Sequence, residues 1–286
     1  MGKGIKLDTS LELTAESIKG GFIYAKPNFN YTDNTLFTSV KSSTSDFLSN
    51  SGYKTSELGF ALGTRFEQFQ NIYLSPELDF LIEDLETSSK ASNTIKKQEG
   101  SYTDLYFNYS INQDLRDKRF RTEDGYVTTF AQELPIVSDN SEISNSFDLT
   151  KYKKLSARSD MVAKVSFFGK TISGLSDDVR ISKRLYLPSY RLRGFEKGKV
   201  GPVDNDDYIG GNHLTALNMS ATLPNILEGL DILDVGIFFD AANIWGIDYD
   251  SSLDDKSTIR SSAGVALNLM TPIGPLSFSF ANALSK

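Results

Sequence analysis

Apolar side chains recur at every second position along most of this chain, and this alternation restricts the fold more than any other feature of the sequence. Between residues 72 and 83, Leu74, Leu78 and Phe80 stand at even positions, whereas Glu77 and Asp79 stand at odd positions. Successive side chains of a β-strand point to opposite faces, so the pattern predicts strands with one apolar face and one hydrated face. No helix-period segment with caps interrupts the pattern, and the sequence therefore predicts an all-β fold.

Roughly 13 strands can be marked in this way, and many exceed the length of about 5 to 6 residues that is usual in soluble sheets. They cover residues 5–15, 21–31, 36–47, 57–66, 72–83, 104–112, 125–136, 145–156, 160–172, 215–223, 233–240, 261–269 and 276–282. Tight connections alternate with long polar ones at 84–100, 174–210 and 246–258. This alternation is typical of a transmembrane barrel whose two rims face different compartments.

A soluble β-sandwich with an apolar inner face would show the same periodicity, so the polar face has to decide between the two folds. That face carries charged side chains that could share a hydrated lumen, while the opposite face is consistently apolar and suits lipid. The charged positions include Lys6, Asp8, Glu12, Glu57, Arg65, Glu77 and Asp79. We therefore expect a transmembrane antiparallel up-and-down β-barrel. A soluble β-rich binding protein, with its apolar face turned inward, is the alternative.

The composition excludes several classes of function. The 286 residues include no cysteine and a single histidine, His213, which leaves little for metal or triad chemistry. A formal net charge of -7 opposes a nucleic-acid partner. The glycine-containing run 194–200 has the wrong spacing for a phosphate loop, and the acidic run 204–207 does not match an EF-hand loop. We expect no enzyme activity, no cofactor and no metal.

Four short motifs follow one another from the long connection 174–210 to the end of the chain. They are Arg193-Gly194-Phe195, Gly210-Gly211-Asn212 at the head of the next strand, Phe238-Phe239-Asp240, and the turn Pro272-Ile273-Gly274-Pro275. Each motif is weak by itself. Their order and spacing together resemble the C-terminal half of the BamA family, the outer-membrane barrel assembly factors.

The resemblance spans the whole chain and implies a partial barrel. Residues 1–286 would form an outer-membrane β-barrel domain with about 13 of the family's 16 strands, which agrees with the odd strand count, since bacterial single-chain barrels close with an even number. The chain would then be a fragment that lacks two leading strands, the closing strand and the periplasmic domains. Residues 1–4 would form the turn that enters the third strand.

The resemblance also implies that the connection 174–210 is a long extracellular loop folded into the lumen. A tip of Arg193, Gly194 and Phe195 combines a cation with five donors, a residue without a Cβ atom and an aromatic anchor, which suits such a loop. A buried guanidinium needs an acceptor. By analogy with the family, that acceptor is Asp240, whereas a second acid that the family often places on the preceding strand falls at Ser220. In the alternative, Arg193 lies in a solvated surface turn.

For function, the resemblance implies an outer-membrane insertase that folds β-barrel proteins into the membrane. Its partners would be unfolded outer-membrane protein clients, accessory assembly lipoproteins and outer-membrane lipid. Two other functions remain open: a two-partner secretion or translocation pore of the same superfamily, and a diffusion porin in which the lumen loop acts as a size filter.

Overall fold

The computed structural model describes residues 4–156, 161–223, 233–249, 253, 257–271 and 274–285, and the motif residue Pro272 lies outside this set. Thirteen strands form one antiparallel sheet in the order β1-β2-β3-β4-β5-β6-β7-β8-β9-β12-β13-β14-β15. These strands are β1 (Lys6–Leu13), β2 (Ser17–Lys26), β3 (Thr35–Phe47), β4 (Tyr53–Phe69), β5 (Ile72–Thr87), β6 (Gly100–Asp114), β7 (Gly125–Ser138), β8 (Glu142–Lys154), β9 (Val162–Gly174), β12 (His213–Leu223), β13 (Leu233–Trp245), β14 (Arg260–Thr271) and β15 (Gly274–Ser285).

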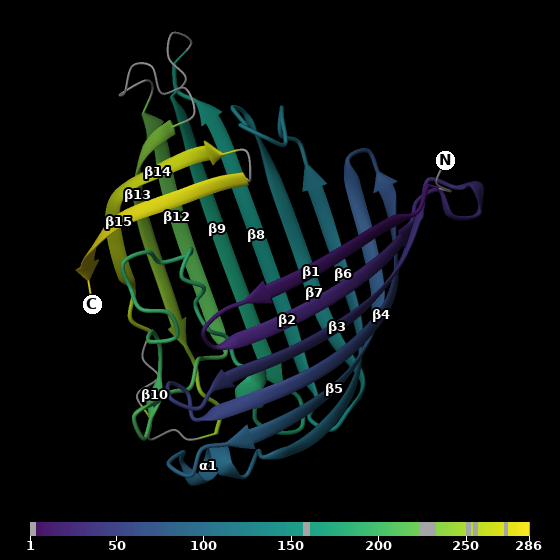
Figure 1. Cartoon of the computed structure of the whole chain (residues 1–286), viewed down its shortest axis with the longest axis vertical. Coiled ribbons are helices and arrows are strands. Elements are labelled where there is room, and N and C mark those ends of the chain that lie inside the picture. The colour runs from purple at the N-terminus through teal and green to yellow at the C-terminus, as the bar shows by residue number, and fades with distance from the viewer. Residues whose placement is uncertain are drawn as a thin grey trace.

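The sheet curls into an incomplete cylinder. In Figure 1 the tall strands β6 to β9 stand at the back, while β1 and β2 in purple and β15 in yellow cross in front of them. Within the described residues, β1 and β15 are the two edges of the sheet, and every other strand pairs with its neighbours on both sides. The prediction of an all-β, up-and-down barrel with about 13 strands is therefore confirmed.

Two local expectations were wrong. The strand expected at 21–31 begins earlier and ends at Lys26, because Asn28 and Asn30 adopt left-handed backbone angles around the 3-10 turn η1 (Phe29–Tyr31). Asparagine tolerates this conformation better than most residues, and the turn ends the ladder. A single-turn helix, α1 (Asn93–Lys96), also forms in the connection after β5, where the Ser92 hydroxyl caps it by accepting the Ile95 N–H.

The apolar face of the sheet points outward. Along β5, the side chains of Leu78, Phe80 and Ile82 are exposed, whereas Glu83, the next residue, is fully buried on the inner face. Exposed Phe107 at the middle of β6 follows the same rule. The outer surface is thus an apolar belt suited to lipid, and the charged face lines the interior, as predicted.

Among the described residues, no helix combines the length and the apolar character needed to cross a membrane.

The dry core lies inside the curved sheet, between its wall and the connection 174–210, which we call the lumen loop. One cluster joins Leu192 of the loop to Leu214 of β12 and Ile244 of β13. A second joins Ile181 and Ile209 to residues of β4, β5 and α1. The loop itself contains the 3-10 turn η2 (Ile181–Lys183) and the short hairpin β10 (Val203–Asp204) and β11 (Asp207–Tyr208). It therefore packs on two separate parts of the wall.

The assignment of faces leads to a matched pair of substitutions on β6. Phe107→Lys places a charge at the lipid side near mid-strand and should lower the free energy of unfolding by about 2–4 kcal/mol. Asn108→Lys places the same charge inside, where Asn108 lies in register with Glu77 and Glu133, and should change stability by no more than about 0.5 kcal/mol. Urea unfolding in lipid vesicles, followed by the fluorescence of the single tryptophan, Trp245, measures both. Equal losses in the two variants would contradict this orientation.

Candidate functional site

The tip of the lumen loop is joined to β13 by a buried ion pair. The Arg193 side chain donates from Nε to Asp240 Oδ2 at 2.7 Å and from Nη2 to Oδ1 at 2.8 Å, and its backbone N–H donates to Oδ2 at 3.2 Å. The Asp240 side chain is fully buried, and that of Arg193 is 23% exposed. Bidentate pairing of this kind fixes both the position and the orientation of the guanidinium. The alternative of a solvated surface turn does not fit this geometry.

Two further side chains complete the surroundings of the pair. Asn218 of β12 lies opposite Asp240 in the β12–β13 register and donates to Asp240 Oδ1 and to the Arg191 carbonyl, at 2.8 Å each. The guanidinium carbon of Arg193 lies 3.4 Å from the centroid of the Phe238 ring. A cation close to an aromatic ring gains additional attraction when water is excluded. The carboxylate therefore has donors on two sides and the guanidinium has a ring beside it.

The other two residues of the tip are held by packing. Gly194 has a φ of +85°, and a Cβ atom placed on it would lie 2.9 Å from the Cβ of Ala281 on β15. Phe195 is partly buried against the cluster around Leu192 and Ile244. Both the backbone angle and the contact with β15 require a residue without a side chain at position 194.

The Gly210-Gly211-Asn212 motif ties the end of the loop to the wall. Gly211 exchanges backbone hydrogen bonds with Leu185 at 2.8 and 3.0 Å. A Cβ atom on Gly211 would lie 2.7 Å from the Trp245 carbonyl, so the close approach needs glycine. Asn212 bonds through its backbone to Ile172 at 2.8 Å and to Gly246 at 2.9 Å. The motif is a junction between the loop, β9 and the end of β13.

The last motif lies at the β14–β15 turn, away from this junction. Gly274 and Pro275 begin β15 and pair in register with Thr271 and Met270. Pro272, the remaining motif residue, lies outside the described residues. These backbone pairs join the start of β15 to the end of β14.

Other side chains of the lumen loop form ion pairs with the wall. Arg191 binds Asp148 of β8, and Arg184 binds Asp248 in the connection after β13. Burial raises the pKa of the Tyr186 hydroxyl in the same loop to about 12, so this group stays neutral at physiological pH. Arg184, Arg191 and Arg193 of the loop thus each pair with a carboxylate.

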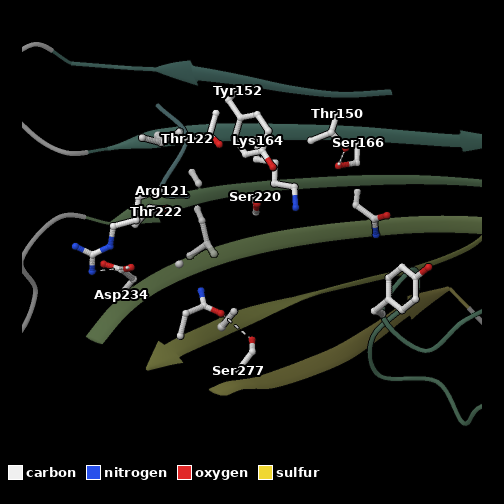
Figure 2. Close-up of a pocket in the computed structure, with 18 of the residues that line it drawn as sticks. Arg121, Thr122, Thr150, Tyr152, Lys164, Ser166, Ser220, Thr222, Asp234 and Ser277 are labelled. Carbon is white, nitrogen blue, oxygen red and sulfur yellow. Dashed lines mark hydrogen bonds and ion pairs between the residues drawn. The ribbon is translucent and has the colours of Figure 1, made fainter. Parts of the chain in front are cut away.

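A polar cavity of about 990 Å³ borders the loop tip. Figure 2 shows its polar lining: Tyr152 of β8, Lys164 of β9, Ser220 of β12 and Ser277 of β15 surround the open space. Arg193 also lines it, which accounts for the exposed edge of its guanidinium. Ser220, the position at which the resemblance placed a second acid, lies in this lining and pairs in register with Phe238, not with Asp240.

No group of three or more His, Cys, Asp or Glu side chains within the described ranges is arranged to hold a metal ion. The acidic run 204–207 forms the β10–β11 hairpin, in which Asp204 accepts a hydrogen bond from the Tyr249 hydroxyl at 2.8 Å. His213 packs its ring on Trp245, with 5.5 Å between the centroids. Asp204 and His213 thus take part in a hydrogen bond and a ring contact within the protein.

Sequence reasoning missed Asn218 and Phe238 as parts of the site. Phe238 lies two residues before Asp240 on the same inner face, so the period of two could have indicated it. Asn218 lies two residues before Ser220, on the same face of its strand. Its place opposite Asp240 depends on the β12–β13 register, which alternation alone does not determine.

The ion pair is tested by removing either partner. Arg193→Ala leaves a fully buried carboxylate without its cation and should cost about 3–5 kcal/mol of barrel stability, and Asp240→Ala should have a comparable effect. Lys197→Ala is the matched control, because Lys197 is half-exposed in its pair with Glu16 and should change stability by less than about 1 kcal/mol. Barrel stability is measured by incubating samples at a series of temperatures and recording on a gel, without boiling, the temperature at which the folded band disappears. Wild-type behaviour in both Arg193→Ala and Asp240→Ala would remove the pair as a structural determinant.

The contact between the loop tip and β15 is tested by comparing two glycines. Gly194 and Gly198 both have positive φ angles, +85° and +76°, but a Cβ on Gly198 would meet nothing within 4 Å. Alanine at either position therefore carries the same backbone strain of about 1 kcal/mol. Gly194→Ala should lower stability more than Gly198→Ala does, because only the new methyl group at position 194 meets Ala281. Adding Ala281→Gly to Gly194→Ala should restore the extra stability that is lost. Equal melting temperatures of the two variants would show that the contact is unimportant.

The chain was compared with known proteins. A family model described as the Omp85 superfamily domain matches residues 1–286. The outer membrane protein assembly factor BamA of Neorickettsia risticii (strain Illinois) is 24% identical over 198 residues, which cover 68% of this chain and 27% of that protein. The protein of the same name from Neisseria meningitidis serogroup B (strain ATCC BAA-335 / MC58) is 32% identical over 124 residues, 33% of this chain and 15% of that protein.

Two solved structures share the fold. BamA from Haemophilus ducreyi lacking POTRA domains 1-3 superposes with a TM-score of 0.86 at 21% identity, covering 99% of this chain and 62% of that one. CdiB from Acinetobacter baumannii gives a TM-score of 0.54 at 12% identity, covering 98% and 56%. The chain thus spans less than two thirds of the length of each of these four relatives. Because the family model covers the chain from end to end, the chain belongs to the Omp85 superfamily.

Proposed function

We propose that this chain forms the barrel wall and lumen loop of an outer-membrane insertase that folds β-barrel proteins and inserts them into the membrane. The domain is located in the outer membrane, as its family and its apolar outer belt indicate. Its proposed partners are unfolded outer-membrane protein clients, accessory assembly lipoproteins and outer-membrane lipid. We propose no catalytic chemistry and no cofactor.

The observation that carries this proposal is the anchored lumen loop within a fold that superposes on BamA over 99% of the chain. The bidentate Arg193–Asp240 pair holds the loop against β13 on the inside of the wall. The two curated relatives carry the name of outer membrane protein assembly factors, and the proposal extends that role to this chain.

The physical basis of insertion would be pairing at an exposed strand edge. An unpaired strand offers N–H and C=O groups to an incoming client strand. In hydrocarbon, those groups have no water to bind, so each new backbone pair contributes far more than it would in water. Folding of the client itself then supplies the free energy, and no nucleotide is required.

The packing of the lumen supports an insertase more than a diffusion pore. The loop places two apolar clusters between itself and the wall, one on β9, β12 and β13 and one on β4, β5 and α1. Apolar clusters of this kind exclude water and ions. The polar cavity that borders Arg193 is lined by other residues, so the apolar clusters occupy a separate part of the lumen.

The test uses the full-length protein that contains this chain, placed in vesicles of outer-membrane lipid. We expect it to accelerate folding of an added client barrel, scored by the shift in gel migration between heated and unheated samples. Arg193→Ala should reduce the folding rate by about tenfold or more, since it removes a buried pair. Lys197→Ala should leave the rate unchanged.

Three measurements separate this proposal from the alternative functions: planar-bilayer conductance, client translocation and solubility without detergent. A steady, ion-selective conductance without client folding would instead assign a diffusion porin. Client translocation across the bilayer without insertion would assign a secretion pore. A protein that remains water-soluble and monomeric without detergent would overturn the membrane function altogether.

A further inference from the structure

Arg180, close to the start of the lumen loop, is the largest of the completely buried side chains among the described residues. Its guanidinium faces carboxylates on three different strands. Nη2 lies 2.6 Å from Asp104 Oδ2 on β6 and 3.9 Å from Glu142 Oε1 on β8, and Nε lies 3.3 Å from Glu83 Oε2 on β5. A loop residue is therefore enclosed by the wall of the barrel.

The carboxylates around Arg180 are buried and partly oriented by other donors. Glu83 and Asp104 have no exposed surface, and Glu142 is 3% exposed. The Tyr106 hydroxyl donates to Glu142 and the Ser138 hydroxyl donates to Asp104, at 2.6 Å each. These three strands thus present a prepared acceptor site for a cation.

Negative charge exceeds positive charge in this site. Three carboxylates face one guanidinium, and the neighbouring cation Lys183 has its Nζ 5.7 Å from the centroid of the Tyr106 ring. The charged and titratable groups that face Arg180 or its partners are Tyr53 and Glu57 on β4, Glu83 on β5, Tyr102, Asp104 and Tyr106 on β6, Asp139 at the β7–β8 connection, Glu142 on β8, and Lys183 on the loop. Loss of Arg180 would leave the buried carboxylates without their main counter-charge, which is strongly unfavourable.

Arg180 and Arg193 bind parts of the wall that are far apart in the sheet. Glu83 is on β5 and Asp240 is on β13, and the sheet order places six strand-to-strand steps between them. Ile181, on one side of Arg180, packs in the cluster that includes residues of β4 and β5, whereas Val179 on the other side packs with Leu192 in the cluster on β9, β12 and β13.

We propose that Arg180 is a second electrostatic anchor of the lumen loop, which fixes the start of the loop to β5, β6 and β8 while Arg193 fixes its tip to β13. The loop then connects two parts of the wall, and Arg180 is a positioning residue that determines where the loop enters the lumen. This inference builds on the loop named in the proposed function, but its test needs no client, so the two can fail separately.

Thiol labelling can report each anchor separately, because this chain contains no cysteine. Ser182→Cys places a thiol where the Ser182 Oγ is buried beside the Arg180 anchor. Val200→Cys places one in the cluster near the tip, where Val200 is 4% exposed. The full-length protein, with no other cysteine, is folded in lipid vesicles and treated with a maleimide. Rates are expressed relative to the urea-unfolded protein at the same pH.

Arg180→Gln should increase labelling at position 182 by about a hundredfold at pH 7.5, since one partner of a buried ion pair has been removed. Labelling at position 200 should stay within about threefold of the parent, because the Arg193–Asp240 anchor remains. Arg180→Met fills a similar volume without charge, so it should behave as Arg180→Gln does. Lys199→Gln, which removes an exposed cation of the same loop, is the matched control and should change neither rate.

A change of pH separates an electrostatic anchor from simple packing. In Arg180→Gln the uncompensated carboxylates favour their neutral form, so lowering the pH to about 4.5 should restore protection at position 182. The parent should lose protection or stay unchanged over the same range, because its ion pairs need ionised carboxylates. Adding Glu83→Gln to Arg180→Gln should restore part of the protection at pH 7.5.

Three outcomes would overturn the proposal. Protection at position 182 that persists in Arg180→Met would show that volume alone holds the loop. Labelling of Arg180→Gln that does not fall at low pH, and is not reduced by Glu83→Gln, would exclude the electrostatic origin. An equal increase in labelling at positions 182 and 200 in Arg180→Gln would mean that the loop detaches from the wall as a whole, and that Arg180 is not a separate anchor.

Discussion

Hydrocarbon offers a peptide group no hydrogen-bond partner, and the architecture of this protein depends on that constraint. Antiparallel pairing joins each strand of the large sheet to the next from β1 to β15, and it satisfies the backbone between the two edge strands. The side chains then separate by the period of two, with residues such as Leu78 and Phe107 facing outward. The charged residues are left on the inner face, where water, or a partner supplied by the chain itself, must accommodate them.

The lumen loop supplies those partners. It carries arginines into an interior that the strands line with carboxylates, and Asp104, Asp148 and Asp240 each receive one of them. Isolated buried charges are costly, whereas paired ones can be accommodated with good geometry. The position of the loop is therefore determined by the wall, and the wall retains its buried acids because the loop is present.

Much of the fold was predictable, because alternation is a local property of each strand. The period of two located the strands and identified which face meets lipid, and it failed where Asn28 and Asn30 turn the chain early. The pairing of Arg193 with Asp240 could be expected only from a family resemblance. The surroundings of Arg180 could not be expected, because they bring together residues of β5, β6 and β8 that only the register and the path of the loop place side by side.

The polar cavity beside the loop tip makes Arg193 and Arg180 physically unequal. It can hold on the order of tens of water molecules, and one edge of Arg193 faces that water while Arg180 has no exposed surface. Mobile ions can approach the guanidinium of Arg193 within a Debye length of about 8 Å and weaken its attraction to the wall. They cannot reach the guanidinium of Arg180. Among the ion pairs that join the loop to its barrel, the one at Arg193 therefore responds to ionic strength, whereas the one at Arg180 is shielded from it.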